Sequence, residues 1–176
     1  MKTKLLCVLY AALLSGCFTP QHIERLTPEQ IAQRSKLSRD QFRKNTVLEG
    51  MNLQFGEMGI NSYGLSATKY DADPSIDYTV WMATKRSPQE GWAFWQDAHD
   101  QNGNELVRPA TSRRVGTDAF TLEAISFSVT RQWLNQAATN GIVIRIDGQR
   151  AQQQLSLPAN YVTGFLLSAD NAFPLK

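Results

Sequence analysis

Apolar and polar residues alternate at period two over most of the chain beyond Thr46. Successive side chains of a strand point to opposite faces of a sheet, so this alternation predicts half-buried strands. The segments that we expect to be strands are 47–55, 63–70, 78–85, 92–96, 106–107, 120–129, 142–146 and 153–157. Many short strands without regular βαβ alternation predict an antiparallel β-sandwich, immunoglobulin-like or related. A partly open β-barrel is the alternative.

Two dipeptides predict tight turns in this pattern. Asp147-Gly148 separates the segments 142–146 and 153–157, and together they form the clearest hairpin in the chain. Asn102-Gly103 predicts a second turn, which leads into 106–107.

The segment 120–129 contains a change of phase. Phe120 and Leu122 alternate with polar neighbours, and the apolar positions then shift to Ile125 and Phe127. A β-bulge near Ala124 would account for the shift, because it adds one residue to one strand of a pair.

Helix signals occur at both ends of the predicted sandwich and once within it. Thr27-Pro28-Glu29-Gln30 has the pattern of a capping box with proline at the first helical position, and Ser38-Arg39-Asp40-Gln41 repeats the Ser-x-x-Gln spacing. We therefore expect a short helical leader over 27–45. Thr130 caps a predicted helix over 131–139, and a final helix over 158–167 is expected to cap the sandwich.

The first residues have the layout of a secretory signal peptide. Lys2 and Lys4 precede an apolar run from Leu5 to Leu14, and small residues stand directly before Cys17. The run is too short for a membrane-spanning helix, which needs about 20 residues.

Leu14-Ser15-Gly16-Cys17 resembles the lipobox of bacterial lipoproteins position by position. The resemblance covers residues 1–17 only, and no functional family is recognised for the remainder. It implies cleavage between Gly16 and Cys17, and lipidation of Cys17 with a diacylglycerol group and a further acyl chain such as palmitate. Two or three chains anchor a protein stably in a membrane. The residue after the cysteine is Phe18 rather than aspartate, which by the same resemblance implies the outer membrane of a Gram-negative bacterium, on the periplasmic side.

These signals divide the chain into four segments. They are a lipoprotein signal peptide (1–16), a lipidated tether (17–26), the short helical leader (27–45) and the β-sandwich domain (46–176).

Cleavage before Cys17 changes the charge and the thiol content. Loss of Lys2 and Lys4 leaves 16 basic against 16 acidic residues, so the mature chain is neutral and nothing in its charge favours nucleic acid. Cys7 leaves with the signal, and Cys17 carries lipid. Thiol catalysis and thiolate metal sites are thereby excluded for the mature domain.

One acidic stretch superficially resembles a calcium loop. Asp71, Asp73 and Asp77 have the spacing of its first oxygen ligands. However, Ile76 stands where the loop glycine belongs, and Met82 stands where the bidentate acid belongs. We expect an ordinary turn here, because aspartate and proline favour turns.

His99 is the better candidate metal ligand. It is flanked by Asp97 and Asp100 and could bind a metal ion with a third ligand from elsewhere in the fold. A hydrophilic loop end is the simpler interpretation, and we expect no cofactor or resident metal.

Aromatic residues gather on two predicted neighbouring strands, which carry Trp81, Trp92, Phe94 and Trp95, with Tyr78 nearby. Strict alternation would place Trp92 and Phe94 together in the core and turn Trp95 to the other face. Trp95 and Tyr78 are therefore the candidate contacts for a partner or ligand.

No catalytic motif is found, so we expect no enzymatic activity. The leading hypothesis is a non-catalytic accessory protein that contacts another component of the cell envelope. A small-ligand or glycan-binding module with an aromatic-lined groove is the first alternative. A hydrolase that uses a carboxylate pair is the second.

Overall fold

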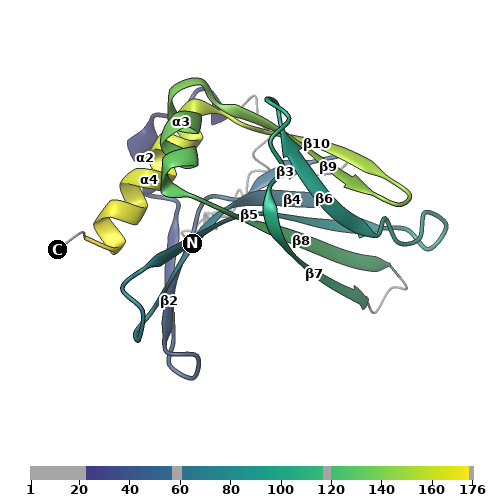
Figure 1. Ribbon diagram of the computed structural model, residues 1–176, viewed down its shortest axis with the longest axis horizontal. Helices are drawn as coiled ribbons and strands as arrows, with labels where there is room; N and C mark the ends of the chain where they lie inside the picture. Colours follow the sequence, from purple (N-terminus) through teal and green to yellow (C-terminus); the bar gives the residue numbers. More distant parts are fainter. Residues whose placement is uncertain (1–22, 57–60, 117–119, 175–176) are drawn as a thin grey trace, which may run out of the picture.

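The computed structural model describes residues 23–56, 61–116 and 120–174, which form two antiparallel β-sheets and three helices (Figure 1). The fold is mainly β, and the predicted antiparallel sandwich is confirmed. Both sheets end in free edges within these ranges and do not close into a barrel.

The large sheet has the strand order β1-β2-β4-β5-β8-β7, with β3 also beside β4, and the small sheet has the order β10-β9-β6. The strands of the large sheet are β1 (Lys36–Asp40), β2 (Asn45–Glu49), β3 (Leu53–Phe55), β4 (Asn61–Tyr70), β5 (Ile76–Arg86), β7 (Val107–Val115) and β8 (Thr121–Val129). The small sheet contains β6 (Trp95–Asp100), β9 (Ile142–Gly148) and β10 (Gln152–Leu157). The helices are α2 (Pro28–Ala32), α3 (Arg131–Asn140) and α4 (Ala159–Ala172).

The core lies against one face of the large sheet, which we call its inner face. Helices gather over one end of this sheet, at the upper left of Figure 1, and the small sheet lies at the upper right. The buried side chains of the three central strands alternate with half-buried ones, as the period-two pattern predicted. They include Tyr63, Leu65, Val80, Met82, Ile125 and Phe127.

A buried carboxylate joins the two sheets. Glu123 on β8 is only 2 % exposed. Its Oε2 accepts hydrogen bonds from the backbone N–H groups of Ala93 (3.0 Å) and Phe94 (3.1 Å). Its Oε1 accepts from the N–H of Trp95 (3.0 Å) and from Arg113 Nε (2.8 Å). Consecutive N–H groups that converge in this way form a backbone anion site, which here ties the start of β6 to the large sheet.

The burial of Glu123 also corrects the predicted bulge near Ala124. β8 pairs with β5 in unbroken register, with Thr84 opposite Glu123 and Met82 opposite Ile125. Glu123 therefore lies on the same face as Ile125, and β8 undergoes no change of phase. The prediction was wrong because it assigned a charged side chain to the solvent.

A tyrosine hydroxyl attaches α4 to the large sheet near the segment between β2 and β3. The N–H of Leu65 donates to Tyr161 Oη (3.1 Å), and the Tyr161 hydroxyl donates to the carbonyl of Met51 (2.9 Å). A Cβ on Gly50 or Gly64 would lie 3.0 Å from this oxygen, so both positions provide the room that the ring needs.

Two of the three helix starts that were predicted from a capping residue are confirmed, together with their caps. Thr27 and Gln30 form the complete capping box of α2, and Thr130 caps α3. The final helix caps the sandwich and extends to Ala172. Among the described residues, no helix combines the length and the apolar character needed to cross a membrane.

The predicted helical leader over 27–45 is wrong beyond α2, because residues 36–40 form β1 and pair with β2. The second Ser-x-x-Gln pattern does not start a helix. Instead, Asp40 Oδ1 accepts from the N–H groups of Phe42 (2.9 Å) and Arg43 (3.0 Å) and thereby stabilises a hairpin turn.

The folded region begins within the segment that was predicted to be a tether, residues 17–26. Ile23 is fully buried. Asn160 Nδ2 donates to the carbonyls of Ile23 (2.7 Å) and Leu26 (2.8 Å). Residues 23–26 are thus part of the folded domain.

Several strand boundaries differ from the prediction: the strand expected over 47–55 is two strands, β2 and β3, and the one expected over 106–107 is the longer β7. The hairpin of β9 and β10 is confirmed, but its turn lies at 149–151, because Asp147 and Gly148 still belong to β9. The strand expected over 92–96 is found at 95–100, since the backbone of 93–95 binds Glu123. The turn at Asn102-Gly103 is confirmed, and Gly103 has a φ of +80° there.

We expect Glu123→Gln to lower the free energy of unfolding by about 3 kcal/mol, because an amide cannot replace a buried carboxylate that accepts from four donors. Urea denaturation followed by circular dichroism measures the change. Glu49→Gln, at an exposed position of β2, is the matched control and should change stability by less than about 0.5 kcal/mol. Equal stability of the two variants would refute the structural role of Glu123.

Gly164→Ala should lower the free energy of unfolding by about 1–3 kcal/mol, although alanine favours helix more than glycine does. A Cβ at this position would lie 2.5 Å from the carbonyl oxygen of Pro28 and 2.7 Å from Ile31 Cβ, so α2 would have to move away from α4. Asn171→Ala on the exposed side of α4 is the control. Thermal unfolding compares the two, and a gain in stability for Gly164→Ala would contradict this packing.

Candidate functional site

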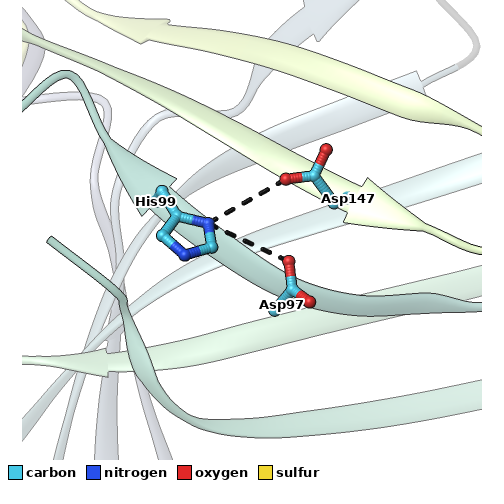
Figure 2. A group of neighbouring side chains, drawn as sticks. All are labelled: Asp97, His99 and Asp147. Atoms are coloured by element: carbon cyan, nitrogen blue, oxygen red, sulfur yellow. Dashed lines mark ion pairs between the residues drawn. The ribbon is translucent and has the colours of Figure 1, made fainter. Parts of the chain in front are cut away.

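Three ligand-bearing side chains meet on the solvent face of the small sheet. Asp97 and His99 are two positions apart on β6 and therefore share a face. β9 pairs with β6 so that Asp147 stands opposite Asp97 and Arg145 stands opposite His99. Figure 2 shows the imidazole of His99 turned toward both carboxylates.

The Nδ1 atom of His99 faces both carboxylates without a hydrogen bond to either. His99 Nδ1 lies 3.9 Å from Asp147 Oδ2 and 4.0 Å from Asp97 Oδ1. This nitrogen is buried and has no hydrogen-bond partner among the described residues. Like charges directly opposite each other on neighbouring strands repel. The Arg145 guanidinium, whose Nε lies 3.0 Å from Asp147 Oδ2, offsets that repulsion.

The group fits the metal hypothesis for His99 only in part. Among the described residues, Asp97, His99 and Asp147 are the single group of three histidine, cysteine or acidic side chains whose ligand atoms all lie within 4.8 Å of one another. Asp147 supplies the third ligand from elsewhere in the fold that the sequence left open. Two ligand atoms bound to one zinc ion lie about 3.5 Å apart, so a small contraction would be required. However, Arg145 Nε donates to Asp147 Oδ2 at 3.0 Å and would repel a second cation. The contacts favour an ion-pair network over a metal centre.

Asp147 is also poorly suited to act as a general acid. Gln152 Nε2 donates to its Oδ1 at 2.6 Å, and Arg145 binds its other oxygen. These hydrogen bonds hold the pKa of Asp147 below its usual value of 3.8, against the opposing effect of burial. A hydrolytic carboxylate pair needs one acid with a raised pKa. The Asp97–Asp147 pair therefore gives the hydrolase hypothesis little support.

The three aspartates of the calcium-like spacing do not converge. Asp71 Oδ2 pairs with Arg39 at 2.7 Å, and Asp73 Oδ1 accepts from the N–H of Ser75 at 2.8 Å. Asp77 lies on β5 opposite Thr68. This segment is the turn between β4 and β5, as expected.

The expected exposure of Trp95 and Tyr78 is wrong, since both are buried, at 3 % and 7 %. Trp95 donates its indole N–H to Thr84 Oγ1 at 3.2 Å, and Tyr78 packs edge-to-face against Phe165. The cause is Phe94, whose φ of +55° interrupts the alternation just before β6. The groove that these two aromatic rings were expected to line is therefore absent from the described structure.

Two adjoining shallow pockets are found instead on the outer face of the large sheet. One pocket, of about 450 Å³, is lined by Trp81 together with Ser66, Thr79, Thr111, Ser112 and Ser126. The adjoining pocket, of about 380 Å³, is lined by Lys85, Arg114 and Leu122, among others. Ser112 and Ala124 line both pockets. We call this surface the outer-face groove; the small residues at alternate positions of β4, β5 and β8 were its sequence signal.

The predicted lipidation and cleavage residues, Cys17 and Gly16, lie outside the described residues. Comparison with known proteins finds no matching family model and no matching curated relative.

Asp147→Asn should lower the free energy of unfolding at about pH 7, and the deficit should shrink at about pH 3. A carboxylate whose pKa is depressed by folding contributes stability above its unfolded pKa, and this contribution is lost as the pH falls through the folded value. Urea titrations at both pH values measure the deficit, with exposed Asp77→Asn as the control. A deficit of the same size at both pH values would show that the charge of Asp147 is not responsible.

Proposed function

We propose that this chain is a lipid-anchored accessory protein of the Gram-negative outer membrane that faces the periplasm and acts by binding another envelope component. The observation that carries the proposal is Leu14-Ser15-Gly16-Cys17, which follows a cationic start and an apolar run. Cleavage there would place lipid on the first residue of the mature chain and leave a neutral domain behind it.

The start of the fold supports a position close to the membrane. Ile23 is buried, and its carbonyl is held by Asn160 on α4. Only residues 18–22 separate Cys17 from this fixed point. Their extended length is about 20 Å. A domain anchored through Cys17 would thus meet partners at the membrane or within a short distance of it.

Binding rather than catalysis is supported by the chemistry of the domain. His99 is the only histidine among the described residues, and it faces two carboxylates in a network with Arg145. The mature chain would have no free thiol, because Cys7 leaves with the signal and Cys17 carries lipid.

A small-ligand or glycan-binding module is the second candidate function. The outer-face groove favours it, because an indole ring and several hydroxyl groups line the same concave surface. This function is compatible with the lipid anchor, since the groove and the start of the fold use different residues.

Metabolic labelling with palmitate in a Gram-negative host tests the anchor. We expect labelled palmitate on the wild-type chain and its recovery with the outer membrane, because two or more acyl chains hold a protein stably. Cys17→Ser should abolish both results, whereas the control Cys7→Ser should leave both unchanged. A wild-type chain without label, or a labelled Cys17→Ser chain, would contradict the proposal.

A further inference from the structure

Among the described residues, Trp81 is the one aromatic side chain that lines the outer-face groove, in its larger part. It lies on β5, with Gly64 opposite on β4 and Ser126 opposite on β8. A Cβ on Gly64 would come within 3.3 Å of Trp81 Cζ2, so the indole lies over the backbone of β4. The ring is half-buried and rests on the sheet. In Figure 1, β8 and then β7 follow β5 across the large sheet.

Free hydroxyl groups surround the indole. Ser66, Thr79, Ser112 and Ser126 line the groove and share the outer face with Trp81. None of these four hydroxyls makes a side-chain hydrogen bond within the described part of the chain. A ligand rich in hydroxyl groups could pair with them without displacing any internal contact.

Two cations stand at the adjoining end of the groove. Lys85 and Arg114 line it on either side of Leu122, which pairs with both of them across the strands. Neither cation forms an ion pair with a described residue. The nearby Glu123 carboxylate is buried among its four donors on the inner face. Trp81 and Lys85 are four positions apart on β5, a span of about 13 Å.

We propose that the outer-face groove binds an acidic oligosaccharide. The apolar face of one sugar ring packs on Trp81, because indole offers a rigid apolar surface at low entropic cost. The sugar hydroxyls bond with the serine and threonine side chains, and a carboxylate farther along the chain pairs with Arg114 and Lys85. The groove volume is within the range of small-molecule sites. This inference deepens the second candidate function and does not depend on the lipid anchor.

Isothermal titration of the protein purified in detergent from a Gram-negative host tests the inference, whether or not that protein carries lipid. The acidic probe is the peptide-free tetrasaccharide of alternating N-acetylglucosamine and N-acetylmuramic acid, and the neutral probe is chitotetraose, which lacks only the lactyl carboxylate groups. We expect saturable binding of both probes, tighter binding of the acidic one, and weakening of that preference as salt screens the charges. Absence of saturable binding, or equal affinity for the two probes, would overturn the inference.

Variants assign the binding to the groove. Trp81→Ala should raise Kd for both probes on the order of 10-fold, whereas Trp81→Phe should retain most of the affinity. The double variant Lys85→Gln with Arg114→Gln should remove the preference for the acidic probe. Arg43→Gln, an exposed cation in the β1–β2 turn, is the matched control.

Circular dichroism and urea denaturation confirm that each variant is folded. Unchanged affinity in folded Trp81→Ala would overturn the inference, as would a preference that survives the double variant. Chemical crosslinking in membranes of the host gives one further outcome. If the wild-type chain binds no sugar but crosslinks to an envelope protein, and the groove variants lose that crosslink, the groove is a protein interface and the inference is also wrong. Palmitate labelling of Cys17 reports on the anchor independently of all these results.

Discussion

The arrangement of the two sheets depends on one buried carboxylate. Removing a charge from water costs several kcal/mol unless hydrogen bonds replace the lost hydration. Glu123 meets this requirement with three successive backbone N–H groups, at 93–95, and the guanidinium of Arg113. The same bonds hold Phe94 in a left-handed backbone conformation, which turns Trp95 into the core. The position of the small sheet and the composition of the core therefore follow from this contact.

The hydrogen bonds of Glu123 to residues 93–95 and Arg113 also determine which surfaces remain for function. The small sheet and the helices occupy the inner face of the large sheet, with Tyr161 fixing the helical end and Glu123 fixing the other. The outer face keeps Trp81, unbonded hydroxyl groups and two cations. The proposed cleavage before Cys17 would leave a neutral domain with little long-range attraction for charged partners. Local chemistry of this kind would then provide its specificity.

The fold could be predicted from alternation wherever polar residues face solvent, and the prediction failed where they do not. Glu123 points into the core, so a regular strand resembled a bulged one. Likewise, the Ser-x-x-Gln pattern at 38–41 is compatible with either a helix start or a hairpin turn. The turn forms because residues 36–40 pair with β2. Only part of the His99 site could be predicted from the sequence, namely Asp97, which is two residues from His99. Asp147 could not be found, since it joins the group only through the register of β6 with β9.

Amide hydrogen exchange at Ala93, Phe94 and Trp95 tests the role of Glu123 most directly. The amide groups of Ala93 and Phe94 precede β6 and bond to the carboxylate rather than to another strand. If the Glu123 carboxylate holds the two sheets together, all three amides should exchange only when the whole protein unfolds, as the amides of the central strands do. Exchange of Ala93 and Phe94 at the rate of an exposed turn, in a folded protein, would contradict the account.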